Sequence, residues 1–336
     1  MVLSTIYLHI RTNIDVVQST QTKSTFQNEY SRRSPIIYKC GRKHRVAFTF
    51  DDGPHPTHTL SIIKTLDRQN VTAGFFVSGT SIQSFLNTHN NLTVQTFERP
   101  RIGYLLLQDY TLLENLLDGH EIYMHGWLHE KITEMQIQTV IDNIATQLLE
   151  IGLLKGFKPI YRAPWGIGTA PFHVNKKVLL PQILKQMGIV PVLWDIDTKD
   201  YVLDVDEDTL INNTLHLICK RKGGLILMHD NRPTTAFFLD RLIRSIRGSG
   251  HKIVSPSEIN QNWTNPMLMK KTRKYIEYLQ KRTLNVQNNV TIRANNYRPV
   301  EIILSSPKGK IEPLHSIFPL TQYQGTIRVR PNINDV

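Results

Sequence analysis

The stretch RVAFTFDDGP, residues 45–54, decides the fold. After Arg45, its β-branched, aromatic and small residues predict a short buried strand that ends at Phe50. Two acids, Asp51 and Asp52, follow directly, and Gly-Pro then turns the chain. Since the carboxyl ends of parallel strands are where α/β folds place their active sites, a strand ending in two acids predicts such a site here.

Strand-like and helix-like runs alternate from residue 45 to residue 255. We expect strands at 45–50, 71–77, 121–124, 159–161, 189–194, 224–228 and 251–254. We expect helices at 57–70, 111–117, 133–153, 174–187, 207–220 and 237–246. Regular alternation predicts a parallel sheet with crossover helices, either a barrel or a doubly wound sheet. The polar stretch 78–110 is interpreted as an inserted loop with a little helix.

Composition excludes several classes of protein. The chain has 336 residues, of which 40% are hydrophobic, so it is neither collagen-like nor disordered. No run approaches the roughly 18 apolar residues of a membrane span, so we expect no transmembrane anchor. Two cysteines, Cys40 and Cys219, exclude a disulfide scaffold and a cysteine-ligated zinc site. Two unpaired thiols are the simpler interpretation, with a Cys40–Cys219 disulfide as the alternative.

Basic residues are concentrated at the end of the chain. The formal charge is 40 − 28 = +12, and residues 256–336 contribute 12 − 5 = +7 of it. The rest is only mildly basic, so we expect no nucleic-acid partner. We expect a basic helix over 266–282 and strands over 289–294, 300–304 and 326–330. This region is either an anchor for an anionic polymer such as cell wall or a solvated extension.

Chemically active residues follow five of the predicted strands. They are Asp51, Asp52, His125, His129, Arg162, Asp195, Asp197, His229 and Asp230. Two histidines four residues apart and one carboxylate suit a divalent metal site that keeps a position for water. With adjacent acids, one carboxylate binds the metal and the other accepts a proton from water whose pKa the metal lowers toward about 7.

Five motifs carry a resemblance to a known family. TFDDGP (49–54), HGWLH (125–129), RAPWG (162–166), DTKDY (197–201) and LMHD (227–230) resemble, in order, the signatures of NodB-type polysaccharide deacetylases, carbohydrate esterase family 4. The resemblance implies an α/β fold, a distorted (β/α)7-type barrel, here with a small C-terminal accessory α+β region. We expect an N-terminal extension over 1–43, the deacetylase domain over 44–258 and the basic accessory region over 259–336.

The resemblance also implies catalytic roles. Asp51 would be the general base and His229 the general acid. Asp52, His125 and His129 would hold one divalent metal, zinc first, with Co²⁺, Mn²⁺ or Ni²⁺ as alternatives. A backbone N–H near Trp165 would help to stabilise the oxyanion.

Further residues would support these groups. Asp200 would orient His229, with Asp195 and Asp197 as alternatives for that task, and Arg162 would pair with Asp51. The acetyl pocket would be walled by Pro164, Trp165, Tyr201 and Leu227.

Each of these roles has a plainer alternative. Arg162 is alternatively an ordinary ion-pair residue, and Asp197 a loop or capping residue. Trp165 and Trp194 are alternatively core aromatics, and Asp230 a turn cap. Loop or surface positions are expected for three histidines near the first motif, His44, His55 and His58.

Among the departures from the family pattern, two fall inside the motifs themselves. Gly126 stands where the second motif usually has Ser or Thr, so the support of the metal ligands is expected to differ. Tyr201 stands where the fourth motif has Trp, which alters the acetyl pocket. Neither change removes a ligand, the base or the acid.

The implied function is removal of N-acetyl groups from peptidoglycan GlcNAc or chitin-like polymers. The alternatives are an O-acetyl esterase of the acetylxylan type, a small cyclic-amide hydrolase of the same fold, and a non-catalytic carbohydrate-binding protein. A polymeric envelope substrate implies an extracellular, periplasmic or envelope location, although Val2–Ile10 shows no clear export signal. The oligomeric state is left open.

Overall fold

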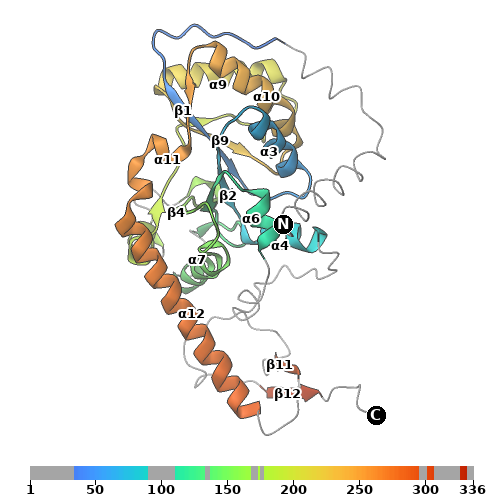
Figure 1. The fold of residues 1–336 in the computed structure, drawn as a ribbon, viewed down its shortest axis with the longest axis vertical. Coiled ribbons are helices and arrows are strands. Elements are labelled where there is room, and N and C mark those ends of the chain that lie inside the picture. Colours follow the sequence, from blue (N-terminus) through green and yellow to red (C-terminus); the bar gives the residue numbers. More distant parts are fainter. Residues whose placement is uncertain are drawn as a thin grey trace, which may run out of the picture. The chain divides into compact units, whose positions relative to one another are not determined.

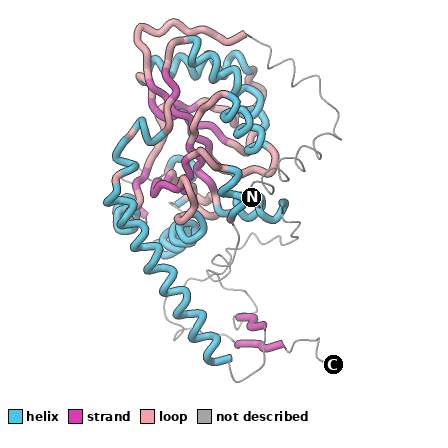
Figure 2. The backbone as a smooth tube through the Cα atoms, in the orientation of Figure 1, coloured by secondary structure: helices cyan, strands magenta, loops and turns pink. Residues whose placement is uncertain are grey.

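The computed structural model describes residues 34–89, 110–132, 137–167, 173–174, 178–294, 301–305 and 326–330. These residues divide into two compact units. The first comprises the described residues of 1–76, 110–122 and 194–261, and the second those of 77–109, 123–193 and 262–336. Figures 1 and 2 trace the strands and helices along the chain.

The first unit is built on parallel strands. Its strands are β1 (Arg45–Asp51), β2 (Gly74–Val77, the last residue of which falls in the second unit), β8 (Ile196–Asp197), β9 (Gly224–His229) and β10 (Lys252–Ile253). They run in the order β2-β1-β9-β8, and β10 also pairs with β1; every pairing is parallel. Apart from Arg45, β1 is buried along its whole length, as expected of a central parallel strand.

Helices cover these strands (Figures 1 and 2). They are α3 (His58–Arg68), α6 (Thr111–Leu116), α9 (Glu207–Arg221), α10 (Pro233–Gly248) and α11 (Pro256–Ile259). α10 packs against both α3 and α9. The Asp206 side chain caps α9 by accepting from Thr209 N, and Pro233 starts α10 where a missing N–H costs nothing.

The second unit repeats the pattern. It contains β3 (Glu121–Met124, shared with the first unit), β4 (Phe157–Tyr161) and β7 (Val190–Pro191), in the order β3-β4-β7. Its helices are α4 (Gly79–His89), α7 (Ile137–Ile151), α8 (Leu180–Met187) and α12 (Pro266–Ala294), with short 3₁₀ turns at Pro164–Gly166 and Gln261–Thr264. Two small antiparallel pairs, β5 (His173–Val174) with β6 (Val178–Leu179) and β11 (Glu301–Ser305) with β12 (Thr326–Arg330), complete the list.

The predicted fold class of parallel strands alternating with helices, of distorted (β/α)7 type, is confirmed. Predicted strands at 45–50, 121–124, 224–228 and 326–330 match β1, β3, β9 and β12 closely. The predicted helix in the 78–110 insert is α4, and residues 90–109 lie outside the described part. The domain boundaries proposed above stay predictions.

Two elements were predicted wrongly. Residues 173–174 and 178–179 are strands, and the helix begins only at Leu180, so Pro181 falls in the first turn, where proline is tolerated. Residues 289–294, predicted as a strand, continue α12. No glycine or proline interrupts 267–294, so nothing in the sequence ends that helix.

The preference for two unpaired thiols was also wrong, because Cys40 and Cys219 form a disulfide with a Cα–Cα distance of 5.8 Å. The segment before β1 runs along α10, where Ile36 N donates to Ser245 Oγ and Tyr38 N to Ser249 Oγ. This path brings Cys40 to Cys219 on α9. Contacts between such distant segments leave no sequence signal. Within the described residues, no helix is long and apolar enough to span a membrane.

Candidate active site

Two acids lie at the carboxyl end of β1, as predicted. Asp51 is the last residue of the strand and is 2% exposed. Asp52 follows in the left-handed region at φ 78° and accepts a hydrogen bond of 3.3 Å from Asn231 Nδ2. The abrupt change in backbone conformation separates the surroundings of the two carboxylates. Asn231 was not predicted, since an asparagine after a strand usually marks only a turn.

His229 and Asp200 form a hydrogen-bonded pair in the first unit. His229 Nδ1 lies 2.8 Å from Asp200 Oδ1, and His229 N donates to Asp200 Oδ2 at 2.6 Å. Thr235 Oγ1, a residue that the sequence did not single out, also donates to Oδ2 at 2.5 Å. Burial alone would lower the pKa of His229, but the hydrogen bond and charge of Asp200, with the charges of Asp51 and Asp52, raise it to about 9. His229 is therefore held as an imidazolium at neutral pH.

The other two acids near the fourth motif accept hydrogen bonds from groups other than His229. Asp197 accepts from Lys199 N at 2.9 Å and from the Tyr201 hydroxyl at 2.9 Å. Asp195 accepts from Leu225 N at 2.8 Å. These contacts favour the loop interpretation for Asp197 and leave Asp200 as the acid bonded to His229.

Two of the predicted pocket residues lie near the His229–Asp200 pair: Tyr201 contacts the His229 ring, and Leu227 precedes His229 by two residues in β9. The Tyr201 ring stands edge-on to the His229 ring with 5.4 Å between centroids, and 41% of the residue is exposed. Partial burial and the hydrogen bond to Asp197 raise the pKa of Tyr201 to about 12, so its hydroxyl stays protonated. Leu227, in β9, is buried.

Asp230 is more than a turn cap. It is 1% exposed, accepts from Thr59 Oγ1 at 2.6 Å, and donates its backbone N–H to Asp51 O. Burial raises the pKa of its carboxyl to about 7. The carboxylate lies so close to Gly53 that a Cβ there would come within 1.8 Å of Oδ2, which explains a glycine in the first motif.

In the second unit, the second motif forms a loop after β3. His125 is 2% exposed, and its Nδ1 lies 2.8 Å from the backbone oxygen of Arg162. A carbonyl only accepts, so Nδ1 carries a proton; in the neutral ring Nε2 then has the lone pair that a metal ligand needs. The His129 ring follows with 5.2 Å between the two ring centroids.

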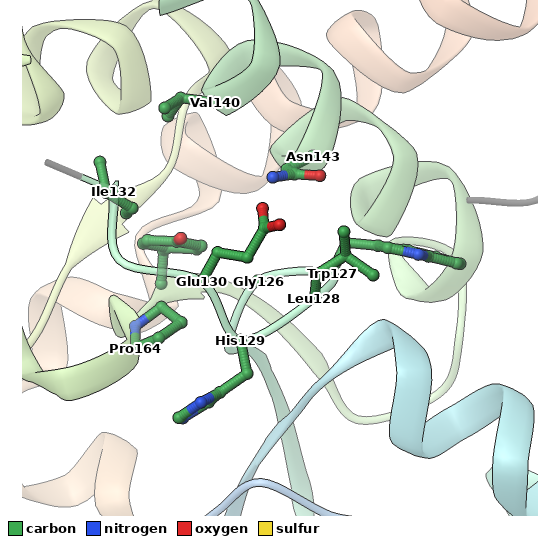
Figure 3. A pocket seen from close by; sticks show the side chains of 10 residues that line it. Gly126, Trp127, Leu128, His129, Glu130, Ile132, Val140, Asn143 and Pro164 are labelled. Atoms are coloured by element: carbon green, nitrogen blue, oxygen red, sulfur yellow. The ribbon is translucent and has the colours of Figure 1, made fainter. Parts of the chain in front are cut away.

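The third motif lies beside this loop. Arg162 is fully buried and its Nη2 donates to Leu193 O at 3.2 Å, while its pairing with Asp51 stays a prediction. Trp165 is 62% exposed, so the core interpretation was wrong for this residue. Its ring centroid lies 5.2 Å from that of His129, and its Nε1 donates to His129 O at 3.4 Å. Pro164 is buried and lines, with the second motif, a small hollow against α7 (Figure 3).

One carboxylate and two imidazoles are a donor set that suits a divalent metal ion. Asp52 belongs to the first unit and the two histidines to the second. Their joint role as ligands stays a prediction. His55 and His58 stack on each other, and His55 Nδ1 accepts from backbone N–H groups of its own loop; His44 stacks on His251. His44 and His55 lie in loops as expected, whereas His58 is the first residue of α3.

The parallel strands carry acids and a hydrogen-bonded histidine at their carboxyl ends, the edge at which α/β enzymes place their active sites. Residues 38–191 match the model of the polysaccharide deacetylase family, and this part of the chain belongs to that family.

Curated relatives extend the match. The chain is 28% identical over 230 residues to the peptidoglycan-N-acetylglucosamine deacetylase PgdA of Listeria monocytogenes, covering 68% of this chain and 41% of PgdA. It is 30% identical over 197 residues to chitin deacetylase 1 of Saccharomyces cerevisiae, covering 57% of this chain and 54% of the relative. The chain thus spans about half or less of these relatives.

Among solved structures, the peptidoglycan deacetylase PdaC of Bacillus subtilis is 22% identical, with a TM-score of 0.46. The alignment covers 71% of this chain and 98% of that structure.

Proposed function

We propose that this chain is a metal-dependent hydrolase that removes N-acetyl groups from amino-sugar polymers. The observation that carries the proposal is the His229–Asp200 pair, in which His229 Nδ1 lies 2.8 Å from Asp200 Oδ1. The hydrogen bond and charge of Asp200, with the charges of Asp51 and Asp52, outweigh burial and raise the pKa of His229 to about 9. Expelling an amine from a tetrahedral intermediate requires a proton donor, and an imidazolium bonded through Nδ1 keeps Nε2–H for that purpose. Names of relatives that deacetylate peptidoglycan and chitin support the same substrate class.

Asp52, His125 and His129 would hold the metal. The fit rests on His125, whose Nδ1–H donates a hydrogen bond to Arg162 O, so that Nε2 of the neutral ring is free to bind a metal. A bound divalent cation would lower the pKa of a water molecule and polarise the acetyl carbonyl. Two imidazoles and a carboxylate suit zinc best, with Co²⁺, Mn²⁺ or Ni²⁺ as alternatives.

The chain's own residues then move the protons. Asp51, buried at the end of β1, accepts a proton from the attacking water. His229 donates its Nε2 proton to the leaving nitrogen, and Asp200 keeps its ring in place throughout. Arg162 would pair with Asp51 and orient its carboxylate. The acetyl group would be enclosed by Pro164, Trp165, Tyr201 and Leu227. A backbone N–H near Trp165 would stabilise the oxyanion.

A substrate panel tests the proposal. The full chain, loaded with Zn²⁺ or Co²⁺, is incubated with N-acetylated chito-oligosaccharides, peptidoglycan and acetylated xylan, and free acetate is measured. Acetate from the first two, matched by new free amines, is expected. Release from acetylated xylan alone would instead establish the O-acetyl esterase alternative, and binding without release the non-catalytic one.

We propose in addition that α12 contacts an anionic cell-wall polymer and that the protein acts at the cell envelope. One face of α12 is docked in the second unit through Thr272, Ile276 and Leu279, and Thr272 Oγ1 donates to Gly188 O. The rest of the α12 surface exposes one acid, Glu277, and five cations: Lys270, Lys271, Arg273, Lys274 and Lys281. Of these, Lys271 also donates to Lys185 O. Such an excess of positive charge suits a polyanion.

Charge reversal is a sharper test than deletion, because deleting α12 would uncover the residues that it buries. Replacing Lys270, Lys274 and Lys281 by Glu is expected to abolish salt-sensitive pelleting with purified wall. The control replaces three other exposed cations, Lys39, Arg42 and Lys43, and should pellet like the unmodified protein. Equal pelleting of both variants would contradict the α12 proposal.

A further inference from the structure

Gly126, between the two histidines of the second motif, has no side chain with which to steady their loop. Its φ is +84°, in the left-handed region that glycine adopts without strain. A Cβ there would lie 3.4 Å from Pro164 Cγ and 3.5 Å from the Tyr161 hydroxyl. The family pattern has Ser or Thr here. Glycine suits the left-handed backbone but offers no side-chain hydrogen bond, so support for the loop must come from other residues.

Gln147 supplies that support from α7. The residue is fully buried, and its Oε1 accepts a hydrogen bond of 2.9 Å from Gly126 N. Its Nε2 donates at 2.6 Å to Val77 O, at the end of β2, which also accepts from His125 N at 3.0 Å. A backbone N–H only donates and a carbonyl only accepts, so the partners fix the orientation of the amide. One side chain thus bonds both to the residue after His125 and to the backbone partner of His125.

The remaining supports of the loop come from α4 and β4. Gly79 N donates to Gly126 O at 3.1 Å and Thr80 N to Trp127 O at 3.0 Å. Figure 3 shows His129 pointing away from Asn143, which lies on α7. Arg162 O orients the His125 ring, as described above. Among the described contacts of this loop, Gln147 is the polar side chain that binds the backbone next to His125.

A buried amide is costly unless each of its groups is paired, and an aliphatic residue would fill the same space more cheaply. Its neighbours on α7 include the buried apolar residues Ile144 and Leu148 and the buried polar residues Asn143 and Glu150. Both hydrogen bonds of Gln147 are directed at the backbone around one metal ligand. This is more than packing alone requires.

We infer that Gln147 is a positioning residue for the metal site. Its side chain bridges Gly126 N and Val77 O and thereby holds in place the backbone that carries His125. The inference rests on the proposed function, since it takes His125 as a ligand. Supporting residues of this kind are typically worth a factor of 10–100 in metal affinity.

The test measures metal affinity rather than turnover. Co²⁺ is titrated into the metal-free full chain and followed by its visible absorption, and competition with a chelator gives the Kd. Gln147→Leu is expected to weaken binding about 10–100-fold and to change the Co²⁺ spectrum. The control Gln83→Leu removes a half-buried amide contact between α4 and α7, to Glu150, and should leave the Kd unchanged.

Gln147→Glu is the rescue variant, and it serves if Gln147→Leu fails to fold. A carboxyl buried here is neutral, so its C=O can accept from Gly126 N while its O–H donates to Val77 O. Near-native affinity at pH 6 is expected for this variant. Native Kd values for Gln147→Leu, or a large loss for Gln147→Glu at pH 6, would overturn the inference. Absence of metal binding by the unmodified chain would instead overturn the proposed function, and this inference with it.

Discussion

Replacing Asp200 by Asn should lower the pKa of His229 by at least 2. The carboxylate accepts two hydrogen bonds from His229 and one from Thr235. The amide keeps the size of the side chain but removes the charge, whereas the burial that lowers the pKa remains. The difference between 6.5 and about 9 corresponds to about 3 kcal/mol in favour of the imidazolium.

The consequence for activity follows from the protonated fraction. At pH 8, about 90% of His229 is protonated with a pKa of about 9, against about 3% with a pKa of 6.5. The rate of Asp200→Asn at pH 8 is therefore expected to fall about 30-fold through this effect alone, and much less at pH 5.5. The alkaline limb of the rate profile should move to lower pH by the same amount.

The free energy of unfolding should also depend on pH in the direction set by the raised pKa of His229. A raised histidine pKa stabilises the folded state fully below pH 6.5, and this contribution is lost as the pH rises through about 9. The unfolding free energies of the native chain and of Asp200→Asn should therefore differ most at low pH and converge above pH 9.

The assay is an NMR titration of His229 in both proteins, paired with the pH profile of acetate release. Asp197→Asn is the matched control, because Asp197 bonds Lys199 N and Tyr201 within its own loop. It should leave the pKa of His229 near 9. A His229 pKa that stays near 9 in Asp200→Asn, or an unmoved alkaline limb, would refute the assignment of Asp200.

Three more predictions follow from the structure. Chelation should abolish acetate release without unfolding the chain, and Zn²⁺ or Co²⁺ should restore it; activity that survives exhaustive chelation would count against a metal site. Cys219→Ser should lower the free energy of unfolding by about 2–5 kcal/mol, measured by denaturant titration, because the disulfide joins residues 179 apart; an unchanged midpoint would speak against the bond. Gly126→Ala should cost about 1–2 kcal/mol of stability because its φ is +84°, with unchanged stability as the contrary result.

The sequence predicted those elements whose signal is local. β1 and β3 carry apolar runs bounded by polar residues, and α9 carries its own cap at Asp206. The acids and histidines could be placed at strand ends because parallel strands bring their carboxyl ends to one edge. The prediction for residues 173–179 was wrong because a two-residue strand is determined by its pairing partner rather than by a periodic pattern.

Other features depend on contacts between segments distant in sequence. The Cys40–Cys219 disulfide depends on the path of the segment before β1 along α10, which no pattern within that segment reveals. Thr235 and Gln147 are ordinary residues of helices, and only their partners in the fold distinguish them. The sequence carried little signal for Gln147, because other polar residues of α7, Asn143 and Glu150 among them, are buried too.

The most direct test of the central claim is acetate release from N-acetylated chito-oligosaccharides by the metal-loaded full chain, compared with Asp51→Asn at equal metal content. The account predicts acetate and free amine in equal amounts from the unmodified chain. It predicts no measurable turnover from Asp51→Asn, which still binds the metal. Turnover by Asp51→Asn comparable to that of the unmodified chain would contradict the assignment of the base, and no acetate from the folded, metal-loaded chain would contradict the proposed activity.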